Sequence, residues 1–356
     1  MSSRSSSQPR HGQRPATIQD VADRAGVSIA TVSRVLNGAD TVDRTLAERV
    51  RAAMEELRYQ PSRAARTLAG RHSTIIGLLV IDMQNPFFME IIRGVEDLAQ
   101  RKGFLAVLCN SAEDPRREHQ YIEVLCAEPV AGAVVVPASD RKPALRLFAE
   151  RGIPVVTIDR RVRDRFVDSV LIDNVGAAYE AVAHLIANGY RRIGLVTGPE
   201  SAPTARERRE GYRLALHAAG IPHDPGLERS GPFLEDSARR QAGELLDLKP
   251  PIDALFTGNN RLTMGALQAL YARGIRVPEE IGLAGFDEVP WATPGAISLT
   301  TVIQPAYEMG YAATARLIER LQHPGGSPRQ DIVLAHQFRV GDSSRPRTFA
   351  SAPLMG

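Results

Sequence analysis

The spacing of apolar residues separates the chain into a short helical start and a long alternating part. In residues 17–57, apolar side chains recur at intervals of three and four, the period of a helix with one buried face. Beyond residue 73 the pattern changes to short apolar runs, each followed by a helical stretch. Eight such runs are TIIGLLV, LAVLCN, GAVVVP, PVVTID, SVLIDN, RIGLVTG, ALFTGN and IGLAGFD. They predict parallel sheets covered by helices, and because eight strands exceed one small sheet, we expect two Rossmann-like lobes.

The first helices carry clear boundary signals. Thr17 and Asp20 have the spacing of a capping box, and Gly26 is suited to end the helix that follows them. Ser28 can cap a second helix, with Thr31 three positions later. Two short helices joined so tightly are what a helix-turn-helix requires. A third helix, which would close the small core, is indicated by Leu46, Val50, Ala53 and Leu57.

One side of the predicted second helix is suited to reading DNA. Val32, Val35 and Leu36 fall on the side that faces the core. On the other side, Arg34 can pair with guanine and Ile29 can contact thymine methyl groups in the major groove. The candidate DNA-contacting residues are Ser28, Ile29, Ala30, Thr31, Ser33, Arg34 and Asn37, with Thr17 at the start of the preceding helix.

Charge is uneven along the chain, and this supports a polyanionic partner for the first segment. The whole chain carries a formal charge of +3, but residues 1–72 alone contain twelve arginines and seven acidic residues. A basic segment of this kind suits nucleic acid. Charge alone is equally compatible with a solvated basic tail.

Two long stretches, ATIQDVADRAGVSIATVSRVLNG and RYQPSRAARTLAGR, resemble the LacI/GalR family of bacterial repressors. The resemblance continues to about Gly341. It implies an all-α helix-turn-helix domain followed by an α/β sensor of the periplasmic-binding-protein type, and a homodimer that binds double-stranded operator DNA. The alternative for the N-terminal helices is a purely structural three-helix domain.

The expected domain order follows from the pattern and the resemblance together. Residues 1–15 form a tail, 16–60 the helix-turn-helix domain, 61–72 a hinge helix and linker, 73–349 the ligand-binding and dimerisation domain, and 350–356 a second tail. By the resemblance, one lobe comprises about 74–172 plus 304–333, and the other about 173–303 plus 334–349.

The hinge segment carries separate chemistry. A helix of fewer than about 12 residues is marginal in water, so residues 61–70 should become helical only when DNA and a partner subunit stabilise them. The resemblance implies that Leu68 inserts into the minor groove, and Arg63 is a further candidate DNA contact. A plain linker is the alternative.

Candidate effector-binding residues follow the predicted strands, because parallel sheets bind ligands at the carboxyl ends of their strands. Phe87 and Phe88 match positions that line the pocket in relatives, and their faces suit a sugar ring or a base; the alternative is a core role. Asp159 and Arg160 end another strand and can bracket a hydroxyl group, with a surface ion pair as the alternative.

Arg208 matches an arginine that relatives use to bind their effectors, and its planar fork suits vicinal hydroxyls or a carboxylate. Arg206 and Arg209 lie close by, and we expect two of these three arginines to be solvated. Asp287 ends a strand and can accept two hydrogen bonds from hydroxyl groups, and Asn259 is a plausible polar contact.

Two further positions bear on the identity of the effector. Trp291 is the only tryptophan and can stack on a pyranose ring, although burial in the core or in a dimer contact is the alternative. Asn260 stands where the family usually has an aspartate. That departure keeps hydrogen bonding, removes a charge and argues against transferring a particular ligand from a relative.

Several classes are disfavoured by what the sequence lacks. No apolar run approaches the roughly 20 residues of a membrane helix, and the N-terminus has no apolar signal region, so we expect a cytoplasmic protein with no membrane partner. Cys109 and Cys126 are expected to be reduced thiols, and no metal or other cofactor is indicated. Without a G-x-G-x-x-G, P-loop or G-x-S-x-G motif, we predict that the chain is not an enzyme.

The sequence therefore predicts a dimeric transcriptional repressor controlled by a small molecule, a sugar or sugar derivative being favoured. A purine or protein coregulator is the alternative, and a sugar-binding receptor without a regulatory role is a weaker one. The C-terminal tail has no heptad pattern, which favours a dimer over a tetramer. Whether the effector releases or promotes DNA binding stays open at this point.

Overall fold

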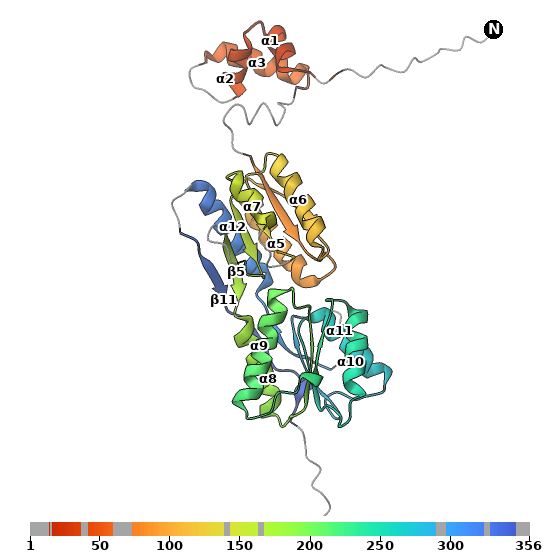
Figure 1. Cartoon of the computed structure of the whole chain (residues 1–356). Coiled ribbons are helices and arrows are strands. Elements are labelled where there is room, and N and C mark those ends of the chain that lie inside the picture. Colours follow the sequence, from red (N-terminus) through yellow and green to blue (C-terminus); the bar gives the residue numbers. More distant parts are fainter. Residues whose placement is uncertain are drawn as a thin grey trace, which may run out of the picture. The chain divides into compact units, whose positions relative to one another are not determined.

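The computed structural model describes residues 14, 16–36, 42–59, 73–138, 143–162, 167–289, 297–323 and 328–346. The chain divides into two compact units, residues 1–73 and 74–356 (Figure 1). Four candidate site residues lie outside the described residues, namely Asn37, Arg63, Leu68 and Trp291.

The first unit contains three helices, α1 (Ile18–Ala25), α2 (Ile29–Leu36) and α3 (Arg44–Glu56), as the apolar spacing predicts. They bury a small core made of Val21, Ala22, Ala25, Val32, Val50, Ala53 and Tyr59. Since each helix contributes only one apolar stripe, the helices depend on one another for stability.

The connection between α1 and α2 explains why a glycine stands at position 26. The backbone of Gly26 lies in the left-handed region, with φ of 64°, and a Cβ atom there would lie 2.7 Å from Nη2 of Arg49. That same Nη2 donates a hydrogen bond to the carbonyl of Ala25, at 2.5 Å. Any larger residue would therefore strain the turn and displace the arginine that ties α3 to the end of α1.

The second unit contains two six-stranded sheets within the described residues. The first consists of β1 (Ile75–Val80), β2 (Leu105–Asn110), β3 (Gly132–Val135), β4 (Val155–Ile158), β5 (Asp168–Ile172) and β11 (Asp331–Leu334), in the order β11-β5-β4-β3-β1-β2. The second consists of β6 (Ile193–Thr197), β7 (Glu228–Ser230), β8 (Ala254–Thr257), β9 (Gly282–Phe286), β10 (Thr300–Ile303) and β12 (Gln337–Arg339), in the order β12-β10-β9-β8-β6-β7. All pairings are parallel except β10 with β12. The predicted fold class is confirmed.

Helices cover both faces of each sheet (Figure 1). The first sheet packs against α5 (Pro86–Arg101), α6 (Pro115–Ala127), α7 (Pro143–Glu150) and α12 (Ala306–Gln322), and we call this assembly the N-lobe. The second packs against α8 (Asn174–Ala187), α9 (Pro203–Ala218), α10 (Glu235–Leu246) and α11 (Asn260–Ala272), which form the C-lobe with it. Two short 3-10 helices, η1 (Pro225–Leu227) and η2 (Asp342–Ser344), complete the C-lobe.

The chain passes between the lobes three times, after β5, after β10 and after β11. The sequence pattern did not include β7, β10, β11 and β12. Three of these strands lie at sheet edges, where one side needs no apolar side chains, and β10 begins with two threonines. Their pairing partners, not their own apolar content, determine that they are strands.

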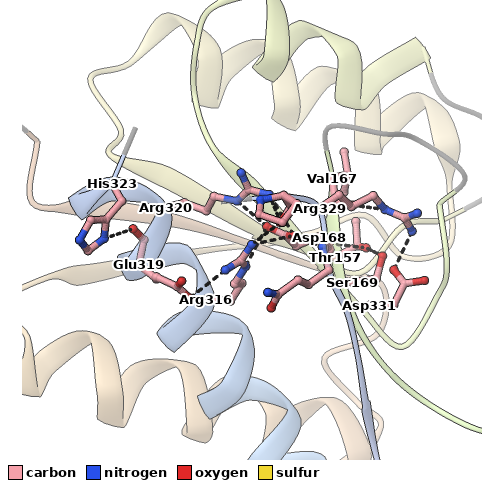
Figure 2. Close-up of polar contacts among 12 residues, drawn as sticks. Thr157, Val167, Asp168, Ser169, Arg316, Glu319, Arg320, His323, Arg329 and Asp331 are labelled. Carbon is pink, nitrogen blue, oxygen red and sulfur yellow. Dashed lines mark hydrogen bonds and ion pairs between the residues drawn. The ribbon is translucent and has the colours of Figure 1, made fainter. Parts of the chain in front are cut away.

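A buried ionic network fixes the segment that returns to the N-lobe (Figure 2). Asp168, at the start of β5, accepts hydrogen bonds from Arg316 at 3.3 Å and Arg320 at 2.7 Å, both on α12. Its carboxylate also accepts from the backbone N–H of Gln330, at 2.6 Å, just before β11. One carboxylate therefore joins α12 and β11 to a strand more than 140 residues earlier in the chain.

Candidate functional site

The candidate DNA-reading residues gather on one surface of the first unit. Ile29 is 43% exposed, and Ala30 and Arg34 are exposed as well, whereas Val32 is fully buried against the core. Arg34 makes no hydrogen bond or ion pair with any residue in the described part of the chain, so its guanidinium group is available to a partner. Thr31 and Ser33 lie at the edge of this surface, half-buried.

Thr17 and Ser28 already have structural roles. The Thr17 hydroxyl accepts from the Asp20 backbone N–H at 3.3 Å, and the Thr17 backbone N–H donates to Oδ2 of Asp20 at 2.8 Å, which completes the predicted capping box. The hydroxyl of Ser28 lies 3.0 Å from that of Thr31 and accepts from its backbone N–H. These hydroxyl groups position the two helix ends, and contact with DNA stays a prediction.

The second unit has a cavity of about 740 Å³ between its lobes, at the carboxyl ends of strands from both sheets. Seven of the eight candidate effector-binding residues line it, and the eighth, Trp291, lies outside the described residues. The seven are Phe87, Phe88, Asp159, Arg160, Arg208, Asn259 and Asp287.

Arg208 is a buried cation in the lining of this cavity. It projects from α9, is only 3% exposed, and donates to Oδ1 of Asn174 at 2.9 Å and to the carbonyl of Gly258 at 2.6 Å. Its guanidinium carbon lies 3.7 Å from the centre of the Phe286 ring, so the group is stacked and orientated. Burial lowers the pKa of Arg208, and the charges of Asp287 and Asp159 oppose that shift.

Asp159 and Asp287 occupy corresponding positions of the two lobes. Asp159 follows β4 and Asp287 follows β9, which are the third strands from the β11 edge and from the β12 edge of their sheets, and their φ values are 67° and 68°. At both residues the backbone is left-handed, and the carboxyl group is buried in the lining of the cavity. Left-handed backbone at residues other than glycine is common at functional positions. Each of the two aspartates is about 5% exposed.

Burial raises the pKa of both carboxyl groups. It raises the pKa of Asp159 to about 6, against the opposing effect of Arg208 and Arg160. It also raises the pKa of Asp287, although Arg208 and a hydrogen bond from Gln304 Nε2 at 2.7 Å favour the charged form. The site thus holds two carboxylates that lack most of their hydration and can gain from hydroxyl donors.

Arg160 has a different partner from the one that sequence adjacency suggests. Its guanidinium group makes a two-pronged ion pair with Glu113, at 2.6 and 2.9 Å, and also donates to the carbonyls of Pro137 and Ala138. Asp159 is farther away, at 3.7 Å from Nε. Arg160 therefore forms a wall of the cavity as part of a buried ion pair and is less available to an effector than Arg208.

The aromatic part of the cavity has three phenylalanines. Phe87 and Phe88 are 8% and 5% exposed, and their rings meet edge to face with centres 5.0 Å apart. Both residues belong to the core and also line the cavity, so the core role and the pocket-lining role predicted from the sequence are compatible. Phe233 also lines the cavity and lies 5.8 Å from the guanidinium carbon of Arg160. It was missed because it stands in a short connection after β7.

Amide side chains complete the polar lining. The Oδ1 atom of Asn259 accepts the Leu262 N–H at 2.9 Å and so caps α11. Gln304, which follows β10, has a buried Oε1 atom without a hydrogen-bond partner among the described residues. Gln304 and Asn85 also line the cavity and were not predicted. For Asn85 the available signal was its position five residues after the first apolar run, whereas Gln304 follows β10, which the apolar pattern did not predict.

The prediction that two of Arg206, Arg208 and Arg209 are solvated is wrong, because Arg209 is buried as well as Arg208. Arg209 is 8% exposed and pairs with Glu228 and Glu200, with 3.4 Å between its Nε and the Glu228 carboxylate. Because α9 packs against the second sheet, residues 208 and 209 are both buried, on different sides of the helix. Arg206 is half-buried and outside the cavity lining.

The described part of the chain shows no helix long and apolar enough to cross a membrane. In the same residues, no cluster of three histidine, cysteine or acidic side chains could hold a metal ion. Cys109 and Cys126 are free thiols, in agreement with the sequence, and burial raises the pKa of both.

Two family models match the chain. "Bacterial regulatory proteins, lacI family" matches residues 17–62, and "Periplasmic binding proteins and sugar binding domain of LacI family" matches residues 73–339. The chain is 34% identical over 310 residues to the ribose operon repressor of Escherichia coli (strain K12), covering 87% of this chain and 94% of that protein.

Solved structures of transcriptional regulators are also similar to this chain. A transcriptional regulator CelR-cellobiose complex is 32% identical, with a TM-score of 0.71 and coverage of 92% of this chain and 99% of that chain. The lac repressor dimer bound to operator and the anti-inducer ONPF is 28% identical, with a TM-score of 0.78 and coverage of 93% and 100%. Both the helical unit and the two lobes therefore have known counterparts.

Proposed function

The chain belongs to the LacI family of bacterial transcriptional regulators, and from this premise we propose that it is a homodimeric repressor whose operator affinity is set by a neutral sugar bound between the lobes. The observation that carries the choice of effector is the buried array of Asp159, Arg208 and Asp287 beside aromatic rings. Family membership by itself supports one part of this proposal, namely that the chain is a LacI-type transcriptional repressor.

The chemistry of the array supports a polyhydroxylated ligand. Carboxylates accept hydrogen bonds from hydroxyl groups, and the guanidinium group of Arg208 donates to neighbouring ring oxygens. Phenylalanine faces pack against the C–H face of a sugar ring. The cavity volume of about 740 Å³ lies within the range of small-molecule sites. It accommodates one or two sugar rings, and the two similar proteins named above are associated with ribose and with cellobiose.

The charge of the lining supports a neutral effector over an anionic one. Five carboxylate residues and three arginines line the cavity. Arg160 is paired with Glu113 and Arg261 with Asp82, which leaves Arg208 facing two carboxylates. A sugar phosphate or sugar acid would add negative charge to a lining that already has an excess of it. We therefore expect neutral sugars to bind and their phosphates and acids to be rejected.

The DNA-binding part of the proposal rests on α2. Its exposed residues Ile29, Ala30 and Arg34 suit the major groove, and Asn37, Arg63 and Leu68 remain candidate contacts outside the described residues. The lac repressor structure, which aligns over 93% of this chain, is a dimer bound to its operator. We propose the same assembly here, acting in the cytoplasm, with two recognition helices on the half-sites of a near-palindrome.

The two lobes supply a means of coupling. The three connections between them permit a hinge motion, and an effector that bridges Asp159 of the N-lobe and Asp287 of the C-lobe favours one relative position of the lobes. If DNA favours a different position, effector and operator each weaken the other, and coupling of about 1 to 3 kcal/mol is typical.

The experiment is a thermal-shift screen of the full chain with neutral sugars, sugar phosphates, sugar acids and purines, followed by an operator gel shift with each compound that stabilises the protein. A neutral sugar should stabilise the wild type and change operator affinity. Arg208→Gln should abolish the stabilisation, and Arg206→Gln, two positions away on α9 and outside the cavity lining, should retain it.

A purine that meets these criteria would instead establish the alternative effector class. Stabilisation by sugar phosphates in preference to neutral sugars would refute the charge argument. If none of the compounds stabilises the protein while operator binding is intact, the proposal of a sugar effector fails and a protein coregulator is favoured.

A further inference from the structure

We infer that two side-chain pairs across the cavity, Asn260 with Asn85 and Arg261 with Asp82, form a latch that holds the lobes together before an effector binds. Asn260 and Arg261 open α11 of the C-lobe, and Asp82 and Asn85 follow β1 of the N-lobe. The Nδ2 atom of Asn260 donates to Oδ1 of Asn85 at 2.8 Å, and Nη1 of Arg261 lies 3.2 Å from Oδ2 of Asp82.

The Asn260 contact explains why an amide, and not the aspartate usual in the family, suits position 260. The Oδ1 atom of Asn85 accepts the backbone N–H of Phe87 at 3.0 Å and so caps α5. Because that oxygen is already fixed as an acceptor, its partner across the cavity must donate. Asn260 has the required N–H group, whereas a carboxylate would place a second acceptor against it. Both asparagines are 3% exposed, so a mismatch would be costly.

Arg261 makes the latch reversible. Its guanidinium group reaches Asp82 of the N-lobe and also lies 3.8 Å from Glu235 of its own C-lobe. When the lobes separate, Arg261 loses Asp82 but keeps a carboxylate nearby. The side chains of Arg261 and Asp82 are 18% and 25% exposed, so the pair is partly desolvated and still able to exchange with water. An element with two available arrangements is what a switch requires.

The latch changes what the effector has to supply. A protein that already populates the closed form binds its effector with nearly the intrinsic affinity, whereas one that is mostly open loses affinity in proportion to its closed fraction. Residues 82, 85, 260 and 261 would therefore set the effector concentration at which the repressor responds. This inference concerns the protein without effector and does not depend on which effector binds.

The experiment measures the distance between the lobes in the full chain without effector. Nitroxide labels are attached at Arg116→Cys on α6 and Asp236→Cys on α10, both exposed, in a background with Cys109 and Cys126 replaced by alanine. Labelled chain is mixed with excess unlabelled chain, and pulsed electron paramagnetic resonance reports the distance within one protomer. The parent protein should give one dominant short distance.

Latch variants should add a longer distance. Arg261→Asp should raise the ratio of open to closed forms by about two- to fivefold, the range expected for a partly exposed pair. Asn260→Asp should raise the same ratio by about fivefold or more, because its contact with Asn85 is buried. The charge-exchanged double variant Asp82→Arg with Arg261→Asp should restore the short distance. Arg273→Asp is the matched control, because Arg273 lies at the other end of α11 and pairs at 3.0 Å with Asp247 of the same lobe.

Circular dichroism confirms that each variant is folded before its distances are compared. Unchanged distances in both Asn260→Asp and Arg261→Asp would overturn the inference, as would a parent protein that is open without effector. Neither outcome bears on the sugar proposal, which the thermal-shift screen tests separately.

Discussion

Removing the charge of Asp159 should stabilise the repressor. Burial raises the pKa of this carboxyl group to about 6, so at pH 7 the fold must hold it in a charged form that its surroundings disfavour. Asparagine has nearly the same shape without the charge, although its Nδ2 group donates hydrogen bonds where the carboxylate accepts them. We therefore expect Asp159→Asn to raise the stability of the effector-free protein and to abolish its response to the effector, since the carboxylate that receives hydroxyl groups is lost.

The magnitude follows from proton linkage. The ordinary pKa is 3.8 and the pKa in the fold is about 6. Each tenfold change in ionisation equilibrium is worth about 1.4 kcal/mol, so the ionised Asp159 lowers the free energy of unfolding by about 3 kcal/mol at pH 7. Because the folded state holds the proton more tightly than the unfolded state, stability rises as the pH falls from about 7 to about 4. The gain from Asp159→Asn should disappear over the same interval.

The assay is thermal unfolding of the second unit in the full chain, followed by circular dichroism between pH 4 and pH 8. At pH 7 the variant should melt roughly 6 °C above the wild type, and at pH 4 the two should coincide. Asp168→Asn is the control of opposite sign. Burial tends to raise the pKa of Asp168, but hydrogen bonds from Arg320, the Gln330 N–H and Arg316 outweigh it and lower the pKa (Figure 2).

A lowered pKa means that Asp168 contributes stability above about pH 4, so Asp168→Asn should melt below the wild type at pH 7 and approach it only in acid. The reasoning would be refuted by an Asp159→Asn protein that is less stable than the wild type at pH 7. A stabilisation of equal size at pH 4 and pH 7 would also refute it, because the effect would then not come from ionisation.

Three further outcomes are expected. Effector affinity, measured by calorimetry, should fall as the pH drops below about 6, where Asp159 takes up a proton, and a flat profile would remove Asp159 from the site. Gly94→Ala should destabilise the N-lobe by at least about 2 kcal/mol in urea unfolding, because a Cβ atom there would lie 2.1 Å from the Tyr307 carbonyl; an unchanged midpoint would show that α5 and α12 can separate at little cost. Arg34→Ala should weaken binding to the specific operator by about tenfold or more in fluorescence anisotropy and bring it closer to binding of unrelated DNA; an equal loss on both DNAs would assign Arg34 to the phosphate backbone.

The local structure of this protein was determined largely by the sequence itself. The Thr17 and Asp20 pair caps α1, and Gly26 ends it, because capping depends on residues within one turn of each other. The eight apolar runs correspond to eight strands. Seven of them are buried on both faces, which needs a continuous apolar segment, and the eighth, β2, is an edge strand that is largely exposed. The candidate cavity residues that follow those runs were also accessible, because parallel strands bring their carboxyl ends to one edge.

Only the tertiary structure decided which side chains meet. Glu113 became the partner of Arg160 across 47 residues, and Asn85 the partner of Asn260 across 175, through the packing of sheets and lobes. Phe233 and Gln304 entered the cavity in the same way, from a short connection and from the end of a polar strand. Such contacts depend on where distant elements come to rest, and no periodicity within a segment encodes that position. The chain's own residues thus determine the elements, and the packing of those elements determines the site.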